Sequence, residues 1–395
     1  MEALLRKSQQ KIKNIPLAFK RYLYYQINFS NRQISILGSR GTGKTTLLLQ
    51  IGAIQAGKTK LYVALDDLFF TDNSLYRLAE EFEKYGGELL LLDEVHKYPG
   101  WSRELKLIYD DFPRLQVIFS SSSILDIYRG ESDLSRRAIT YTLKELSFRE
   151  YMFFHHDIQL PHYTLENLIK AHENISLDLV NQIKPLKYFR QYKKHGAYPF
   201  YNGDENEYYQ QIKNIINLIL EVDLPAVKPI EYVNITKIKR LLYVLAVNVP
   251  FTPNISRLSE KTGLPRNALV QALQLLNRAE IIHILYKQSR SISLLNKPDK
   301  IWLNNASLSY ALSDGKPDEG SLRESFFVSQ LNGLHTVSLA DKGDFMVDNT
   351  YIFEVGGKNK SQKQIKGLKN AFVVKDNVET GVLNNIPLWL FGLLY

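Results

Sequence analysis

The chain contains no cysteine among its 395 residues. It therefore has neither disulfides nor thiolate zinc ligands, and this composition suits a cytoplasmic protein. It also lacks any apolar run that approaches the roughly 18 residues needed to cross a bilayer. Residues 1–16 are amphipathic and basic but include no long apolar segment, so we expect neither a signal peptide nor contact with a membrane.

The composition that remains is ordinary for a globular protein, with 45% hydrophobic and 23% charged residues. The length predicts about two to four domains. Fifty Lys and Arg against 41 Asp and Glu give a formal charge of +9. This charge is compatible with binding to nucleic acid, although many proteins with no such partner are equally basic.

Short β-rich runs alternate with helical stretches between residues 31 and 145. This alternation is typical of an α/β fold in which crossover helices connect the strands of a parallel sheet. The segment before it, residues 1–30, has a basic helical pattern, and residues 146–250 are mostly helical. The five β-rich runs are QISIL, KLYVAL, ELLLLD, LQVIFS and AITYTL.

A glycine-rich stretch follows the first of these strands and fits the pattern G-x-x-x-x-G-K-[ST] in full. Its glycines allow successive backbone N–H groups to face one point, and the N-terminus of the following helix favours an anion there. We expect Lys44 to reach the β- and γ-phosphates of ATP and Thr45 to bind Mg²⁺. The expected phosphate-binding residues are Gly38, Ser39, Arg40, Gly41, Thr42, Gly43, Lys44, Thr45 and Thr46.

The apolar run ELLLLD ends at Asp93, and a second acidic residue, Glu94, follows directly. The carboxyl end of a buried parallel strand is where such sheets bind ligands. We therefore expect Asp93 to hold the Mg²⁺ through water. Glu94 is the expected general base, which orients and deprotonates the attacking water.

Further catalytic candidates follow the next strand. Ser120 begins a run of four serines, and one of these hydroxyls is expected to sense the γ-phosphate. Arg136 and Arg137 come directly before the last strand, where one of them is a candidate arginine finger that acts within the chain or on a neighbouring subunit. The alternative for the two arginines is a solvated pair or a structural ion pair.

Together these motifs resemble the prokaryotic AAA-like P-loop ATPases that carry a winged helix and a C-terminal domain of the PD-(D/E)xK nuclease-like type. The resemblance covers nearly the whole chain, and it implies ATP hydrolysis coupled to a conformational switch, with nucleic acid or another protein as partner. The segments that carry it are the P-loop, LLDEVHKYPGW at 91–101, the serines at 120–123, DLSRRA at 133–138, LKELSFREYM at 143–152, GAYPF at 196–200 and a C-terminal Asp/Glu pattern.

On this basis we expect five parts of the chain. A helical segment precedes an AAA-like core, and a helical lid, a winged helix and a small α/β nuclease-like domain follow it. The expected boundaries are 1–30, 31–145, 146–235, 236–312 and 313–395.

The expected winged helix begins with two helices around Gly263. Asn254 is positioned to cap the first helix, and Leu269, Ala272, Leu273 and Leu276 form the apolar stripe of the second. Residues 251–300 contain eight Lys and Arg against three Asp and Glu. Contact with DNA through Arg266, Lys287 and Arg290 is one interpretation, and a role in packing or protein interaction is the other.

The C-terminal segment carries a possible second metal site. If residues 348–350 form a hairpin loop, Asp344 lies opposite Glu354, and two opposed carboxylates repel each other unless a cation joins them. Glu324, on a helix over 320–331, is expected nearby. Lysine usually occupies position 356 in this family, but here that residue is glycine, so Lys358 is the expected replacement. The stretch SQKQIKGLK is expected to form a basic helix.

We therefore expect an Mg²⁺-dependent ATPase that acts on DNA. The alternative is a nucleotide-controlled binding protein whose C-terminal domain does not cleave and instead docks DNA or a protein partner. An ordinary hairpin with surface acids is the remaining interpretation of residues 344–354. The sequence indicates neither the oligomeric state nor the identity of a protein partner.

Overall fold

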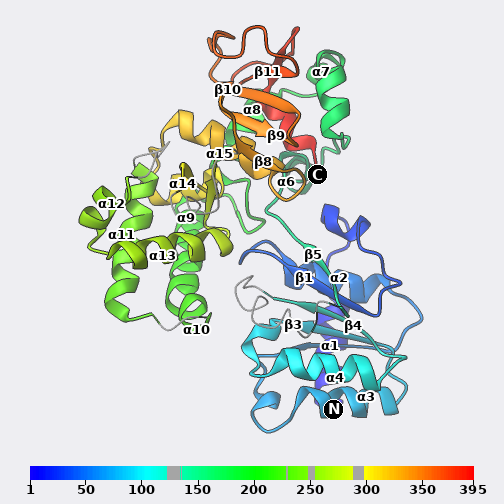
Figure 1. The fold of residues 1–395 in the computed structure, drawn as a ribbon. Coiled ribbons are helices and arrows are strands. Elements are labelled where there is room, and N and C mark those ends of the chain that lie inside the picture. Colours follow the sequence, from blue (N-terminus) through cyan, green and yellow to red (C-terminus); the bar gives the residue numbers. More distant parts are fainter. Residues whose placement is uncertain (122–133, 135, 228–229, 248–253, 288–297) are drawn as a thin grey trace. The chain divides into compact units, whose positions relative to one another are not determined.

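The computed structural model describes residues 1–121, 134, 136–227, 230–247, 254–287 and 298–395. The expected sites at Ser122, Ser123 and Arg290 lie outside these residues. The chain forms two compact units (Figure 1). The first holds Met1–Glu145, and the second begins at Leu146 and includes the C-terminal Tyr395.

A five-stranded sheet forms the centre of the first unit, with the strand order β2-β3-β4-β1-β5. Every neighbouring pair is parallel, which confirms the expected parallel sheet. Because β4 lies between β1 and β3, its carboxyl end separates the P-loop strand from the acidic strand. The bounds are β1 Gln33–Leu37, β2 Lys60–Ala64, β3 Leu89–Asp93, β4 Gln116–Ser120 and β5 Ile139–Thr142.

Helices cover both faces of this sheet. Successive leucines of β3 point to opposite faces, so both faces are apolar and need cover. Leu90 and Leu92 are buried in the same core as Leu78 and Leu105 of two helices on one face. Leu91 points the other way, against Gly52 of α2. The helices are α1 Glu2–Lys13, α2 Lys44–Ile54, α3 Leu75–Lys84 and α4 Trp101–Asp111, with 3-10 turns η1 Tyr22–Tyr25, η2 Leu68–Thr71 and η3 Val95–Lys97.

The second unit starts with helices, as the pattern after residue 146 predicts. The first of them begins with a capping box in which Ser147 and Glu150 bond each other's backbone N–H groups. Phe148, Tyr151 and Met152 of this helix are buried, in agreement with their helical spacing. The helices are α6 Phe148–His156, α7 Leu165–Val180, α8 Pro185–His195, α9 Glu205–Leu218, the π-helical turn η4 Ile219–Asp223, α10 Leu224–Val227, α11 Tyr232–Val247 and α14 Ala306–Leu312.

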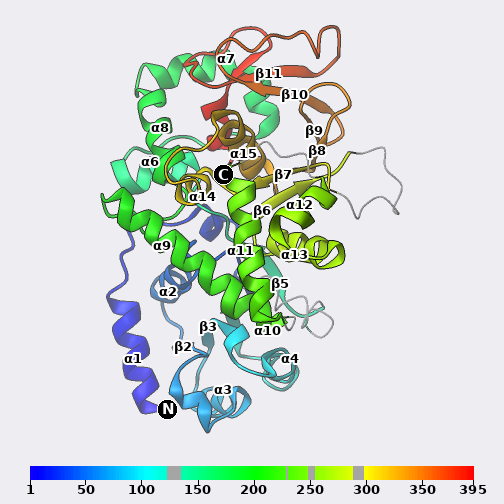
Figure 2. The same ribbon diagram turned by 90° about the vertical axis from the view of Figure 1, so that its left-hand side faces the viewer.

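Two helices and an antiparallel strand pair follow α11 (Figure 2). The Asn254 side chain caps the first helix by accepting from the Arg257 N–H, and Gly263 ends that helix with a left-handed φ of 72°. All four residues of the expected apolar stripe of the second helix are buried. The elements are α12 Ile255–Thr262, α13 Arg266–Arg278, β6 Ile282–Leu285 and β7 Lys300–Leu303.

The C-terminal part contains a second five-stranded sheet, with the order β12-β11-β10-β9-β8. Strands β8, β9 and β10 pair antiparallel, and β10, β11 and β12 pair parallel. Tyr351 lies opposite Val347, so the register expected from a three-residue loop is confirmed. The elements are α15 Glu319–Leu331, β8 Val337–Leu339, β9 Phe345–Val347, β10 Tyr351–Gly356, β11 Ala371–Lys375, β12 Asn385–Pro387 and the 3-10 helix η6 Leu388–Leu393.

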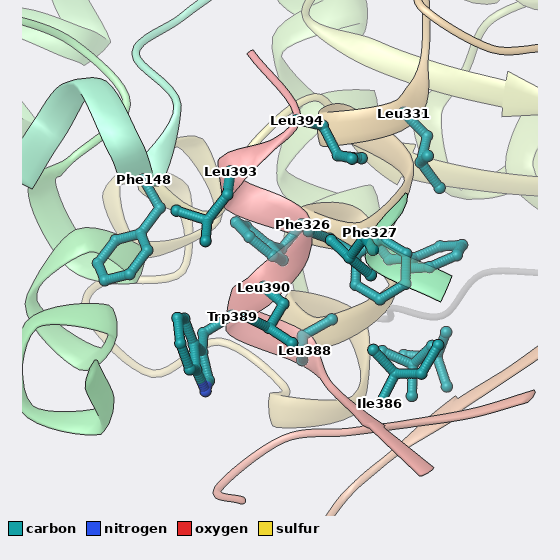
Figure 3. Packing of buried hydrophobic residues seen from close by; sticks show 14 of the residues in the cluster. Phe148, Phe326, Phe327, Leu331, Ile386, Leu388, Trp389, Leu390, Leu393 and Leu394 are labelled. Carbon is teal, nitrogen blue, oxygen red and sulfur yellow. The ribbon is translucent and has the colours of Figure 1, made fainter. Parts of the chain in front are cut away.

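The core of the second unit gathers around η6. Figure 3 shows Phe148, Phe326 and Phe327 around this short helix, which also buries Trp389 and Leu390. Side chains that lie far apart in the sequence thus share one apolar core.

The expected basic helix over residues 361–369 is wrong, because this segment forms turns. Gly367 adopts a φ of 81°, which is incompatible with a right-handed helix. Ile365 is buried in a small cluster with Ala371 and Val373. Ile365 and Leu368 therefore hold the segment through apolar contacts, without a helical face.

Candidate functional site

The glycine-rich loop of the first unit wraps around the end of its own lysine. Lys44 begins α2, and its Nζ donates to the carbonyl oxygens of Gly38 at 2.9 Å and Ser39 at 2.7 Å. Gly43 has a φ of 94°, a conformation that favours glycine. The ammonium is buried beside the loop. A positive charge therefore lies where the backbone N–H groups of the loop and the helix N-terminus also favour an anion.

Asp93 at the end of β3 accepts hydrogen bonds from three other elements. Thr45 Oγ1 donates to its Oδ2 at 2.7 Å, Tyr62 OH donates to the same oxygen at 2.9 Å, and Ser120 Oγ donates to Oδ1. The strand order brings these residues together, since β2 and β4 flank β3. Burial and the neighbouring Asp93 carboxylate raise the pKa of Tyr62, so the phenol remains a donor. Tyr62 was not expected from the sequence.

Glu94 lies next to Asp93 in a conformation that is unusual for a residue other than glycine. Its φ is 54°, and its N–H donates to Ser120 Oγ at 3.2 Å. Its Oε2 lies 3.7 Å from Arg40 NH1 and 3.6 Å from His96 Nε2. Strained backbone of this kind is often found at functional sites. The expected base is thus held by a residue of the glycine-rich loop and by a histidine that the sequence did not single out.

A buried arginine, Arg21, stabilises the glycine-rich loop through hydrogen bonds to backbone carbonyl oxygens. Arg21 donates from NH1 to the Thr42 carbonyl oxygen and from NH2 to the Lys144 and Glu145 carbonyl oxygens, at 2.6 Å and 3.0 Å. Ser39 Oγ donates to Glu145 Oε1 at 3.0 Å, and burial raises the pKa of Glu145. The contacts of Arg21 and Ser39 with Lys144 and Glu145 join segments more than one hundred positions apart. No local pattern in the sequence indicates them.

The two arginines before β5 have different surroundings. Arg137 forms a two-pronged ion pair with Asp110, with distances of 3.0 Å and 2.9 Å, and it lowers the pKa of that carboxyl through its hydrogen bonds. This matches the interpretation of a structural ion pair. Arg136 is exposed, as are Thr45 and Thr46 at the start of α2.

The C-terminal hairpin brings two acids to one place in the second unit. Asp344 lies across from Glu354 and bonds both neighbours of that residue. The Asp344 N–H donates to the Phe353 carbonyl oxygen at 2.9 Å, and Asp344 Oδ2 accepts from the Val355 N–H at 2.8 Å. Glu354 is fully buried. The expectation that both acids lie on the same side of the hairpin agrees with these contacts.

The lysine beside these acids is Lys360, and the expectation of Lys358 is wrong. Lys360 Nζ lies 2.6 Å from Glu354 Oε1 and 3.8 Å from Asp344 Oδ2, whereas Lys358 is exposed. A turn closed by the hydrogen bond from the Lys360 N–H to the Gly357 carbonyl oxygen returns the chain to the strand. Burial lowers the pKa of Lys360, but the hydrogen bond to Glu354 and the surrounding carboxylates outweigh burial and raise the pKa overall.

Glu324 lies near the two acids but has other partners. Its Oε2 accepts from Trp302 Nε1 at 2.9 Å and from Lys300 Nζ at 3.3 Å. Burial is the main cause of its raised pKa, and the charge of Asp344 adds to it. Within the described part of the chain, no three His, Asp or Glu side chains are grouped so that they could hold a metal ion. The described helices also include none that is long and apolar enough to cross a membrane.

Residues 30–152 match a family model described as an AAA domain. They contain the glycine-rich loop, the acidic strand end and Ser120, which the fold brings together. This segment is an AAA-type P-loop domain. Residues 186–319 match a second model, described as a domain of unknown function (DUF8612).

The chain also matches three known proteins over more than half of its length. An uncharacterized protein of Methanocaldococcus jannaschii is 27% identical over 297 residues, which are 70% of this chain and 61% of that relative. The chain thus spans about three fifths of the length of the curated relative it matches.

Two solved structures also align with the chain. The Walker-type ATPase of Pyrococcus abyssi has a TM-score of 0.41 and 13% identity, over 79% of this chain and 95% of that one. AMPPCP-bound DnaA from Aquifex aeolicus has a TM-score of 0.25 and 18% identity, over 69% and 86% of the two chains. At these TM-scores, neither alignment identifies the fold of the whole chain.

Proposed function

We propose that the chain is an Mg²⁺-dependent ATPase in which nucleotide binding and hydrolysis at the AAA domain drive a conformational switch. The hydrogen bond between Thr45 and Asp93 is the observation that carries this proposal. It joins the hydroxyl that follows the loop lysine to a buried carboxylate. Both oxygens are ligands of the kind that Mg²⁺ prefers, and Mg²⁺ would neutralise charge on the phosphates.

The residues of the AAA domain fit distinct roles toward ATP. Lys44 and the loop N–H groups bind the phosphates, and Thr45 with Asp93 would hold Mg²⁺. Ser120 contacts both Asp93 and the Glu94 N–H, so it is positioned to report the state of the γ-phosphate to the catalytic acids. Glu94 is the proposed base for the attacking water.

We propose that the contact between Arg40 and Glu94 belongs to the resting state of the ATP site, before a nucleotide binds. The two side chains lie 3.7 Å apart, and the guanidinium holds the carboxylate through charge. Phosphates bound at the loop compete for Arg40, and their arrival would release Glu94 toward water. Arg136 is exposed before β5, so we assign the finger role to it and propose that it acts on a neighbouring copy.

DNA is the proposed partner of the segment from α11 to β7. Its order of helices and an antiparallel strand pair supports the winged helix expected from the sequence, in which the second helix of the pair would enter the major groove. Arg266 at the start of α13 and Lys287 after β6 are both exposed. These two charges are available for phosphate contacts that position the protein on a duplex.

A nucleotide-controlled binding protein is the second candidate function. It is favoured by the ion pair between Lys360 and Glu354, which neutralises an acid that a nuclease-like domain would use for a metal. In this candidate the C-terminal domain docks DNA or a protein and does not cut. Mn²⁺-dependent nicking that disappears in Asp344→Ala, with ATP hydrolysis unchanged, would contradict it.

The experiment that tests the proposed function is ATP turnover by the purified chain, measured with and without duplex DNA. Turnover that needs Mg²⁺, is lost in Lys44→Ala and rises with DNA supports an ATPase that acts on DNA. Nucleotide binding without turnover under both conditions supports the binding protein.

A further inference from the structure

A buried histidine next to the proposed base has contacts on two sides. His96 belongs to the 3-10 turn η3, and only 3% of its side chain is exposed. Its Nδ1 lies 3.1 Å from Ser121 Oγ, and its Nε2 lies 3.6 Å from Glu94 Oε2. The imidazole therefore lies between the end of β4 and the carboxylate of Glu94.

A tight turn places this imidazole against Glu94. Glu94 has a left-handed φ of 54°, and its carbonyl oxygen accepts from the Lys97 N–H at 2.9 Å. Val95, between Glu94 and His96, is fully buried in the apolar core of the first unit and anchors the turn there. The backbone and the core thus fix the position of the ring.

Two successive serines connect the end of β4 to the two acids. Ser120 Oγ donates to Asp93 Oδ1 and accepts from the Glu94 N–H. Ser121 is also fully buried, and its hydroxyl contacts His96. One serine thus bonds the acids directly, and the other is connected to Glu94 through the imidazole.

The charge of Glu94 determines which ring nitrogen of His96 carries the proton. A neutral imidazole has one N–H donor and one acceptor nitrogen. A carboxylate attracts an N–H and repels a nitrogen lone pair, so Glu94 favours the tautomer with the hydrogen on Nε2. Nδ1 is then an acceptor, and the Ser121 hydroxyl is its donor.

The contact between His96 and Glu94 is suited to shorten when a nucleotide binds. A distance of 3.6 Å is too long for a hydrogen bond, but bonds between catalytic groups are often long before the substrate arrives. Arg40 NH1 lies 3.7 Å from the same Oε2. Once bound phosphates draw Arg40 away, Nε2 can close on Oε2, which leaves Oε1 to take a proton from the attacking water.

We propose that His96 is a positioning residue for the catalytic acid: it donates Nε2–H to Glu94 Oε2, and Ser121 holds the required tautomer. A reactive group and a partner that is itself oriented by a third group form a recurrent catalytic arrangement. The inference rests on the proposed ATPase activity. It adds two side chains that act on hydrolysis without holding the nucleotide.

The test is single-turnover ATP hydrolysis by the full chain, with affinity measured by a fluorescent ATP analogue. His96→Phe keeps a flat ring but loses the donor, and hydrolysis should slow by at least about tenfold, as expected for a lost hydrogen bond to a charged group. His96→Gln keeps an N–H donor and should recover the rate to within about threefold of wild type, and both variants should bind ATP within about threefold of wild type.

Two matched variants define the specificity of this effect. His162→Phe replaces an exposed histidine of the second unit, and it should hydrolyse ATP as wild type does. In Glu94→Gln, adding His96→Phe should change the rate by less than about twofold, because the histidine acts through that carboxylate.

Ser121→Ala is a second variant, since it removes a single hydroxyl and disturbs the fold less than a change at His96. It should slow hydrolysis by about threefold or more, and it should cause no further loss in His96→Phe, because both side chains act on one group.

Three results would overturn the inference in an active wild type. The first is wild-type hydrolysis in Ser121→Ala or in folded His96→Phe. The second is equal slowing by His96→Phe with and without the Glu94 carboxylate. The third is a loss of ATP affinity that accounts for the whole effect. A wild type that hydrolyses no ATP would instead contradict the proposed function on which the inference rests.

Discussion

Thr45 Oγ1 and Asp93 Oδ2 are joined by a hydrogen bond of 2.7 Å, although 48 positions separate the two residues in the sequence. The parallel sheet explains this contact. Strands β1 and β3 both end at the same edge, and α2 starts directly after the loop that follows β1. The first hydroxyl of that helix and the last residue of β3 thus meet at one point.

Replacing Lys44 tests the phosphate site. Lys44→Ala removes a buried ammonium that lies within the loop, and hydrogen bonds to charged groups contribute about 1.5–3 kcal/mol. We therefore expect ATP affinity to fall at least about tenfold. Equilibrium titration with a fluorescent ATP analogue measures this loss. Lys13→Ala, at an exposed position at the end of α1, is the control and should bind as wild type does.

Replacing Ser120 tests the link between the two acids. Ser120→Ala removes the donor to Asp93 and the acceptor of the Glu94 N–H. Turnover should fall by about tenfold or more, while the KM for ATP changes less than threefold, because the phosphates are held by the loop. Steady-state kinetics separates the two constants. A rise in KM at unchanged kcat would show that Ser120 only helps to bind the nucleotide.

DNA binding through α13 and β6 should depend strongly on salt, since phosphate contacts release counterions. Charge reversal with Arg266→Glu and Lys287→Glu should lower both the affinity for duplex DNA and the slope of log K against log salt. Fluorescence anisotropy at several KCl concentrations measures both. Lys184→Glu, at the exposed residue directly before α8, is a control outside this segment. If the double reversal leaves both quantities unchanged, this segment does not contact DNA.

The stability of the second unit should decrease in mild acid because of His155. Burial, with the charges of His156 and His195, lowers the pKa of His155 from 6.5 to about 4. The unfolded chain then binds a proton that the folded chain does not bind between these values. Stability therefore falls as the pH drops from 6.5 toward 4.

Urea unfolding at pH 7 and pH 5 checks this effect. His155→Phe keeps an aromatic ring beside Tyr151 and should lose less stability between the two pH values than wild type loses. His162→Gln, at an exposed histidine, serves as the comparison. An equal acid loss in wild type and His155→Phe would exclude His155 as its source.

Features set by local pattern could be predicted from the sequence. The alternation of β-rich runs with helical stretches predicted the parallel sheet. A hairpin loop of three residues predicted the strand register in which Asp344 lies opposite Glu354. The Asn254 cap and the stripe of α13 follow from helical spacing in the same way.

Features set by long-range contacts could not be predicted in this way. Tyr62 reaches Asp93 only because β2 is the neighbour of β3, and Arg21 reaches Glu145 across the fold. Lys360 reaches the two acids through a turn that its N–H closes on the Gly357 carbonyl oxygen, with its stem over Gly356. The prediction of Lys358 assumed that the strand stays extended after Glu354, with alternate residues on one face. The chain instead turns back, so that assumption selected the wrong lysine.

The measurement that tests the central claim most directly compares ATP binding and single-turnover hydrolysis in Glu94→Gln. This variant removes the base but leaves Lys44, Thr45 and Asp93 in place. The proposal predicts ATP affinity within about threefold of wild type and hydrolysis slowed by at least about a hundredfold, within the range for loss of a general base. Hydrolysis at the wild-type rate in Glu94→Gln, with binding intact, would contradict the proposed catalytic role of the AAA domain's acidic strand end.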